Sequence, residues 1–319
     1  MTLNTSPNSG RLIYGCMGLG GDWDATPYTA ADVDLAAAVI DAARAAGMTL
    51  FDHADIYTSG KAESVFGEVL AATPGLRDKI TLQTKCGIRL AGEGLPGRYD
   101  LSGENILARV NESLRRLKTD YVDILLLHRP DPLMDVREAA DAVARLMNDG
   151  KVRALGVSNM SAEQIAYLQD TVETPIVANQ LEMSLGKRAW LESTVLVNRD
   201  DDGAAGFPHG TLEHAATQGI ELQAYGSMAQ GRYTGSASSS PADAAAAAMV
   251  SSLAESYGCA PEAVVLGWLM KHPARISPVV GTTNLGRIAA CADARRVADA
   301  MSREDWYGLW IAARGGDLP

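Results

Sequence analysis

The chain lacks several features that mark particular protein classes. It holds only four cysteines among 319 residues, and none of them forms the C-x-x-C pair of zinc or thioredoxin-like sites. It contains no run of about 18 apolar residues, which a membrane-spanning helix would require. Its first twelve residues include no apolar segment of the kind found in secretory signals. We therefore expect free thiols, a reducing compartment and a cytoplasmic location, with no membrane contact.

The chain also lacks an excess of basic residues. It carries 28 Lys and Arg against 39 Asp and Glu, which gives a formal net charge of -11 at pH 7. A nucleic-acid surface needs clustered positive charge, so we expect no DNA or RNA partner. A small anionic ligand is still compatible, because a few local positive groups can hold one. No sequence feature predicts a metal site or an oligomeric state.

Short β-rich segments recur along the whole chain. They span residues 11–17, 48–54, 79–85, 122–128, 152–159, 175–180, 220–225 and 276–283. Helical patterns fill the gaps, as where Ile106, Val110 and Leu114 follow one helix face. Alternating strands and helices favour parallel strands with right-handed crossovers. Eight such units predict an α/β fold of the (β/α)₈ TIM-barrel type.

An open, doubly wound sheet is the alternative fold. It normally carries a G-x-G-x-x-G turn after its first strand, and the Gly-rich stretch at 15–21 does not fit that pattern. No shift in composition marks a second domain, so residues 1–319 are predicted to form a single domain. The irregular stretches near 86–102, 181–208 and 226–242 are expected to be long loops after the third, sixth and seventh strands.

Polar residues stand where the predicted strands end. The second strand ends at Asp52, with Tyr57 five residues later, the third at Lys85 and the fourth at His128. In a barrel of this type the chemistry lies at these carboxyl ends. An ammonium lowers the pKa of a nearby phenol, and an imidazole can donate to a substrate oxygen. The set suits protonation of a carbonyl oxygen, and a nicotinamide cofactor would supply the hydride.

Six segments, taken in chain order, resemble the aldo-keto reductases. They are FDHADIY (51–57), LQTKCG (82–87), LLLHRPD (125–131), GKVRALGVSN (150–159), ANQLEMS (178–184) and LQAYGSMAQGR (222–232). The resemblance covers nearly the whole chain, and residues 122–135 and 301–319 are most similar to a bacterial oxidoreductase subgroup. It implies that Asp52, Tyr57, Lys85 and His128 form a catalytic tetrad. Tyr57 would be the general acid in the reduction of aldehydes and ketones to alcohols, with its pKa lowered by Lys85.

The resemblance also implies that NADPH binds without a Rossmann domain, with NADH possible. The implied cofactor residues are Ser158, Asn159, Gln180, Tyr225, Gly226, Ser227, Met228, Ala229, Gly281, Thr282, Thr283 and Arg287. Many members of the family carry a lysine at the position of Gly281, and a Glu-Asn pair at the positions of Ala290 and Cys291. These departures weaken the expected preference for NADPH over NADH.

Alternatives remain open at several positions. Trp23 follows the first strand and either lines the substrate pocket or covers the edge of the core. Lys85 alone would also suit a Schiff-base aldolase, but that reading leaves Ser158 and Tyr225 unexplained. His53 is expected to point away from the side of Asp52, because neighbouring strand residues alternate. The alternative function is a cofactor-binding regulatory protein of the same fold with little turnover, which an intact tetrad argues against. The expected partner is a small-molecule carbonyl substrate.

Overall fold

The computed structural model describes residues 10–92, 94–199, 206–236 and 240–319. Its main sheet is a closed barrel with the strand order β1-β10-β9-β8-β7-β6-β3-β2. These strands are Ile13–Gly15 (β1), Leu50–Asp52 (β2), Thr81–Cys86 (β3), Val122–Leu127 (β6), Val152–Ser158 (β7), Ile176–Glu182 (β8), Glu221–Tyr225 (β9) and Ser277–Val280 (β10). Each strand lies in or overlaps one of the eight predicted segments. The predicted (β/α)₈ barrel is therefore confirmed.

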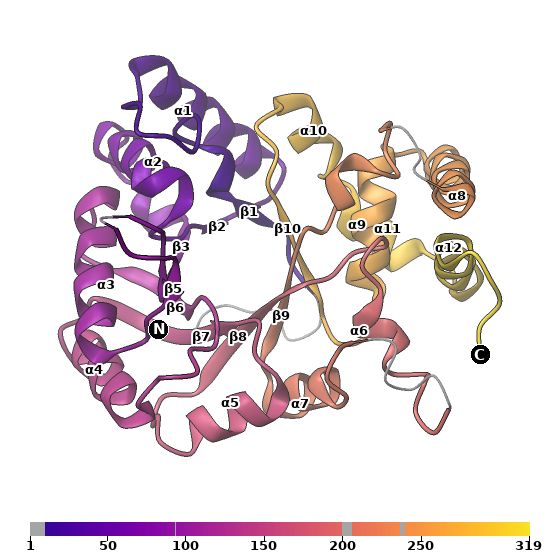
Figure 1. Cartoon of the computed structure of the whole chain (residues 1–319). Coiled ribbons are helices and arrows are strands. Elements are labelled where there is room, and N and C mark those ends of the chain that lie inside the picture. The colour runs from indigo at the N-terminus through magenta and orange to yellow at the C-terminus, as the bar shows by residue number, and fades with distance from the viewer. Residues whose placement is uncertain (1–9, 93, 200–205, 237–239) are drawn as a thin grey trace. The chain divides into compact units, whose positions relative to one another are not determined.

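Helices follow the strands along the chain, as the colour gradient of Figure 1 shows. They are Ala30–Ala45 (α1), Lys61–Ala72 (α2), Gly103–Leu117 (α3), Val136–Asn148 (α4), Ala162–Gln169 (α5), Ala189–Glu192 (α6), Thr211–Gln218 (α7), Pro241–Tyr257 (α8), Pro261–Lys271 (α9), Leu285–Ala290 (α10), Ala294–Ala300 (α11) and Arg303–Arg314 (α12). Side-chain caps fix where several helices begin. The Asp135 carboxylate accepts from the backbone amides of Arg137 and Glu138 and so satisfies two free donors at the start of α4.

The chain divides into two compact units, each of which is described here by itself. One comprises Ile13–Leu181 and Gly281–Ile288, and the other comprises Met1–Leu12, Glu182–Val280 and Ala289–Pro319. In the first unit, helices α2, α3 and α4 lie along the outside of β2, β3, β6 and β7 (Figure 1). The prediction that residues 1–319 form a single domain stays a prediction.

In the unit Ile13–Leu181, strand register places the carboxyl ends of neighbouring strands together. Asp52 of β2 pairs with Gln83 of β3, and Lys85 of β3 pairs with Leu126 of β6. Both faces of these parallel strands are covered, so their side chains are almost all buried. The polar residues that end the strands therefore meet at one edge of the sheet.

In the other unit, an aromatic cluster joins α9 and α12. The indole rings of Trp268 and Trp306 stack with their centroids 5.4 Å apart. Each indole N–H donates to the backbone carbonyl of the other residue at 3.0 Å. Trp190 and Trp310 complete the cluster, which fills the space between these helices with large apolar rings.

The three stretches predicted as long loops contain short elements that the sequence analysis missed; in residues 226–242 these are the turn Ala229–Gly231 and the start of α8 at Pro241. Residues 86–102 include an antiparallel pair of two-residue strands, Ile88–Arg89 (β4) and Arg98–Tyr99 (β5). Residues 181–208 contain the single-turn helix α6. Residues 93, 200–205 and 237–239 of these stretches lie outside the described part of the chain. Such short elements have too few residues to leave a periodic signal in the sequence.

Candidate active site

The ammonium group of Lys85 is the centre of a buried hydrogen-bond network. Its Nζ atom lies 2.7 Å from Asp52 Oδ2, 2.8 Å from Tyr57 Oη and 2.9 Å from the backbone carbonyl of His53. The side chain is fully buried. An ammonium has three protons to donate, and here each of them has an acceptor. The positions of the carboxylate and the phenol are thus fixed relative to Lys85.

Strand geometry explains how Asp52 and Lys85 meet. Asp52 pairs with Gln83 in the β2–β3 register, and Lys85 lies two residues further along β3 on the same face. Gln83 Nε2 also donates to Asp52 Oδ1 at 2.6 Å, so both carboxylate oxygens are engaged. The sequence analysis missed Gln83, although its two-residue offset from Lys85 in a strand was a usable signal.

Tyr57 and His128 complete the predicted set of four residues. Tyr57 opens the short turn Tyr57–Gly60 after β2, and its ring centroid lies 6.2 Å from that of His128 in an edge-on arrangement. The backbone amide of His128 donates to the carbonyl of Cys86 at 2.9 Å, which fixes its position just after β6. His128 Nδ1 is buried without a hydrogen-bond partner among the described residues. The structure therefore brings Asp52, Tyr57, Lys85 and His128 together.

Burial dominates the ionisation of the phenol and the imidazole. It raises the pKa of Tyr57 above its ordinary value, and this effect exceeds the lowering caused by the Lys85 ammonium. The expected lowering by Lys85 is present, but desolvation outweighs it, so the net shift of the Tyr57 pKa is upward. Burial lowers the pKa of His128 to about 2, and the charges of Lys85 and Arg129 act in the same direction. At neutral pH the phenol is protonated and the imidazole is neutral.

The ammonium remains charged in spite of its burial. Desolvation lowers the pKa of Lys85, but Asp52 and Tyr57 raise it by more, so that the net value lies above the ordinary one. The thiol of Cys86, next in the chain, has its pKa raised by burial and stays un-ionised. The network therefore contains one positive charge and its paired carboxylate.

Two other predicted residues flank this network. The rings of Trp23 and Tyr57 lie 6.4 Å apart at a steep angle, and Trp23 is half exposed. His53 packs its ring edge-on against Phe66 with centroids 4.6 Å apart, away from Asp52 as expected. Burial lowers the pKa of His53 to about 3, and both its ring nitrogens lack a partner among the described residues. His53 therefore serves as an uncharged core residue.

The first group of predicted cofactor residues lies at the ends of β7 and β8. Ser158 Oγ donates to the Gln180 carbonyl at 2.8 Å, and the Asn159 backbone amide donates to the same carbonyl at 3.0 Å. Asn159 Nδ2 donates to Ser158 Oγ at 2.8 Å. Asn159 adopts a left-handed backbone with φ 58°, which asparagine tolerates better than most residues. The structure thus gathers three polar residues after these two strands.

The second predicted group follows β10. The Thr282 carbonyl accepts from Tyr14 Oη at 2.9 Å, and Gly18 leaves close packing space for the Thr283 side chain. Asn284 Oδ1 accepts from the backbone amide of Arg287 at 3.0 Å. One amide at the start of α10 is therefore already satisfied, and α10 spans only six residues. The prediction of a helix start with free amides holds only in part.

The third predicted group belongs to the other unit. The Tyr225 carbonyl accepts from the Met183 amide at 3.3 Å, and Gly226 has φ 64°. Ser227 Oγ donates to the Val279 carbonyl at 2.7 Å. Ala229 and Gln230 adopt unusual positive φ values of 45° and 57° in the short turn Ala229–Gly231 that follows Met228. This loop is thus held in a specific, sterically costly conformation.

A second charged cluster lies beside Tyr57, and the sequence analysis missed it. Burial raises the pKa of Asp55 to about 7; Glu63 adds to the effect, while Arg109 and Arg116 oppose it. Asp55 Oδ1 has no hydrogen-bond partner among the described residues. Glu63 lies on the apolar face of α2, four residues before Gly67. A charged residue on the buried face of a helix is the sequence feature that could have indicated this cluster.

Neither a metal cluster nor a membrane span occurs in the described part of the chain. No group of three or more His, Cys, Asp or Glu side chains within residues 10–92, 94–199, 206–236 and 240–319 is placed to hold a metal ion. Within the same ranges, no helix combines the length and apolar character needed to cross a bilayer.

Comparison with known proteins identifies the family. A model of the Aldo/keto reductase family matches residues 11–307. A 6-dehydroglucose reductase from Agrobacterium fabrum is 38% identical over 317 residues, which cover 97% of this chain and 95% of that protein.

Two solved structures share the fold. A glycerol dehydrogenase from Gluconobacter oxydans has a TM-score of 0.78 at 23% identity, with 99% of this chain and 98% of that one covered. An aldo-keto reductase from Klebsiella pneumoniae, solved in complex with NADPH, has a TM-score of 0.72 at 22% identity, with 97% and 92% covered.

The fold and the relatives together define an oxidoreductase built on an α/β barrel. The protein belongs to the Aldo/keto reductase family.

Replacement of Asp55 by Asn should change how stability depends on pH. The folded-state pKa of about 7 exceeds the ordinary value of 3.8, so protonated Asp55 stabilises the fold. That contribution is complete below pH 3.8 and is lost as pH rises through about 7. We expect Asp55→Asn to gain stability over the wild type as pH rises, by at most about 4 kcal/mol.

Urea unfolding of both proteins at several pH values checks this expectation. Asp34→Asn, at an exposed position of α1, is the matched control and should follow the wild type. Parallel pH curves for the wild type and Asp55→Asn would show that Asp55 ionises normally.

Proposed function

We propose that this protein reduces aldehydes or ketones to alcohols with NADPH, with Tyr57 as the general acid. The observation that carries the proposal is the buried contact of the Tyr57 phenol with the Lys85 ammonium at 2.8 Å, beside Asp52 and His128. A protonated phenol next to a fixed positive charge suits a reaction in which negative charge builds on a carbonyl oxygen. The family assignment supports the same reaction class.

Each of the four residues has a distinct role in this proposal. The Tyr57 hydroxyl donates its proton to the carbonyl oxygen, and Lys85 stabilises the phenolate that remains. Asp52 keeps Lys85 charged and aimed at Tyr57 through the 2.7 Å contact. His128, neutral at physiological pH, donates a hydrogen bond from Nε2 to the same oxygen and orients it. In alcohol oxidation the phenolate of Tyr57 would act as the base.

The proposed cofactor supplies the hydride that none of these side chains can provide. The amide and hydroxyl groups at the ends of β7 and β8 suit a carboxamide, which needs both donors and acceptors. Ser158, Asn159 and Gln180 would hold that group. We also assign Tyr225 to the nicotinamide ring and Gly226, Ser227, Met228 and Ala229 to the pyrophosphate.

The preference for NADPH rests on the segment after β10. Thr282, Thr283 and Arg287, together with the backbone of Gly281, would contact the 2′-phosphate that distinguishes NADPH from NADH. Gly281 supplies no positive charge to the 2′-phosphate, so the preference for NADPH is weakened and NADH can also bind.

The substrate is proposed to be a small carbonyl compound. A panel of carbonyl compounds tests this proposal. It includes aromatic aldehydes and dicarbonyls, and also sugar aldehydes because of the similarity to a 6-dehydroglucose reductase. The alternative of a regulatory protein with little turnover has weaker support, because the hydrogen bonds among Asp52, Tyr57 and Lys85 are complete. Steady NADPH consumption with any panel member excludes that alternative.

Replacement of Tyr57 by Phe should lower kcat for carbonyl reduction by roughly 10²- to 10⁴-fold, because the proton donor is removed. Binding of NADPH should change little. Steady-state assays and a fluorescence titration measure the two effects. Tyr28→Phe, which removes a surface hydroxyl that contacts Glu68, is the control and should retain full activity. A Tyr57→Phe enzyme with more than about a tenth of wild-type turnover would exclude the role.

Replacement of Arg287 by Ala should weaken the binding of NADPH more than that of NADH. A bidentate guanidinium–phosphate contact is charge-assisted, and only NADPH carries a phosphate at this position, so we expect a loss of roughly 10-fold or more for NADPH. Parallel fluorescence titrations give both dissociation constants. Equal losses for the two cofactors would contradict the placement of Arg287.

A further inference from the structure

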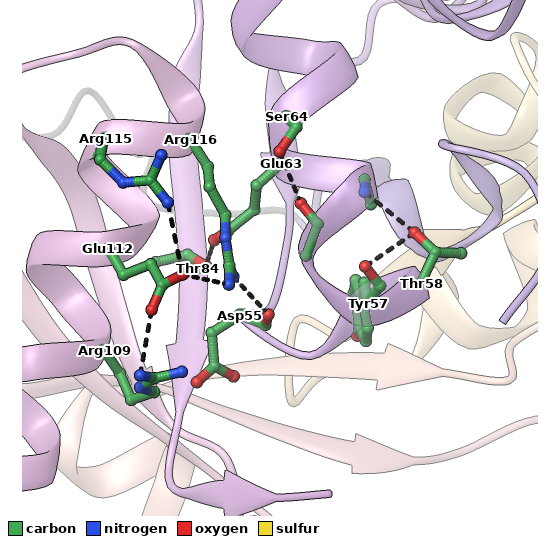
Figure 2. Close-up of polar contacts among 12 residues, drawn as sticks. Asp55, Tyr57, Thr58, Glu63, Ser64, Thr84, Arg109, Glu112, Arg115 and Arg116 are labelled. Atoms are coloured by element: carbon green, nitrogen blue, oxygen red, sulfur yellow. Dashed lines mark hydrogen bonds and ion pairs between the residues drawn. The ribbon is translucent and has the colours of Figure 1, made fainter. Parts of the chain in front are cut away.

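An ion pair between a buried carboxylate and a partly buried guanidinium lies behind the strand that carries Lys85. Glu63 of α2 is fully buried, and its Oε2 atom lies 3.4 Å from Arg116 Nη1 of α3. Arg116 Nη2 also reaches Glu112 Oε1 at 2.6 Å. Figure 2 shows the Arg116 guanidinium between these acidic groups and Asp55. A buried ion pair is weak evidence for stability, because desolvation offsets its attraction. The contacts of Arg116 instead indicate that the pair holds a neighbouring backbone segment in position.

Arg116 holds the chain segment that leads to Tyr57. Its Nη1 atom donates to the backbone carbonyl of Asp55 at 2.8 Å (Figure 2), while the amide of Asp55 donates to the carbonyl of Lys85 at 3.0 Å. The same guanidinium packs against Gly60, where an added Cβ would lie 2.4 Å from Arg116 Cζ. Arg116 thus contacts both ends of residues 55–60, and Tyr57 lies between them.

This segment needs external support, because its backbone is strained. Thr58 and Ser59 have φ values of 46° and 59°, and Gly60 follows at 88°. Left-handed conformations at two successive non-glycine residues persist only where surrounding contacts enforce them. Thr58 Oγ1 provides one such contact, donating to the Leu19 carbonyl at 2.9 Å and accepting from the Ala62 amide at 2.9 Å. Arg116 provides the contacts on the opposite side.

The same cluster is tied to the strand of Lys85. Thr84 Oγ1 donates to Glu63 Oε1 at 2.7 Å, and Thr84 directly precedes Lys85 in β3. The close approach of α2 and α3 at Gly67, where an added Cβ would lie 2.0 Å from the Arg116 carbonyl, fixes the distance between the two helices. The Glu63–Arg116 pair therefore links the backbone next to the phenol with the strand segment next to the ammonium.

We propose that Arg116, paired with Glu63, is a positioning residue for Tyr57 that sets the 2.8 Å contact between Tyr57 Oη and Lys85 Nζ. Arg116 touches neither group directly and acts through the backbone of residues 55–60. The inference rests on the proposed role of Tyr57 as the general acid. It adds that the geometry of this acid depends on a residue outside the four.

Two variants test the proposal. Arg116→Met removes every contact of the guanidinium, and Arg116→Lys keeps a positive charge beside Glu63 but loses the planar group that reaches several acceptors at once. Arg115→Met is the matched control, because Arg115 directly precedes Arg116 in α3, is largely exposed and, among the described residues, forms an ion pair with Glu112 alone, at 3.5 Å. Circular dichroism and thermal melting establish which variants fold. If Arg116→Met does not fold, the test rests on Arg116→Lys.

We expect kcat for carbonyl reduction to fall by about 10- to 100-fold in the Arg116 variants, since a displacement of the acid on the order of 1 Å has this effect. KM and the NADPH dissociation constant should stay near their wild-type values, and Arg115→Met should retain full activity. A purely structural role would lower the melting temperature and leave kcat unchanged. That result in both Arg116 variants overturns the proposal.

A second readout does not depend on activity. The ¹³Cζ signal of Tyr57 in protein labelled at tyrosine, assigned with Tyr57→Phe, reports the hydrogen bond between the phenol and Lys85. We expect the signal to move in Arg116→Lys and to stay in place in Arg115→Met. An unmoved signal in Arg116→Lys overturns the inference, whatever the activity. Absence of carbonyl reduction in the wild type together with a moved signal would instead refute the proposed function alone.

Discussion

The charge on Lys85, held without access to water, is the constraint on which the rest of this site depends. A buried ammonium is tolerated only when its protons are matched by acceptors, and here a carboxylate, a phenol and a backbone carbonyl supply them. The same hydrogen bonds that stabilise the ammonium also fix the positions of the Asp52 carboxylate and the Tyr57 phenol. Removal of one partner would leave a buried charge unsatisfied, so the set behaves as a unit.

The barrel meets this constraint through the alternation of side chains along β3. Gln83 and Lys85 project to the side of Asp52, whereas Thr84 between them contacts Glu63 of α2. The strand therefore joins two charged clusters, one that contains the phenol and one that holds the backbone leading to it. A parallel sheet suits this arrangement, because helices cover its outer face and bury Glu63 and most of Asp55.

Much of this organisation could be predicted from the sequence, and the limits have physical reasons. The alternation of strand and helix patterns predicted the eight strands. The meeting of Asp52, Lys85 and His128 followed from the rule that the carboxyl ends of parallel strands lie at one edge of the sheet. Lys85 lowers the pKa of Tyr57 as expected, but the net rise was not predicted, because desolvation depends on packing that a linear pattern does not encode. Arg116 was missed because its partner Glu63 lies 53 residues away along the chain. The β4–β5 pair was too short to leave a periodic signal.

The central claim is that a protonated Tyr57, held by Lys85, delivers the proton. The pH dependence of NADPH oxidation in a single turnover tests it most directly, because product release does not contribute. Neither His128 nor Lys85 changes its charge near neutral pH, since the pKa of the first is about 2 and that of the second is raised. The account predicts a constant rate through neutral pH and a decline only above the ordinary phenol value of about 10. A decline centred between about pH 6 and pH 8, retained after Asp55→Asn, would contradict it.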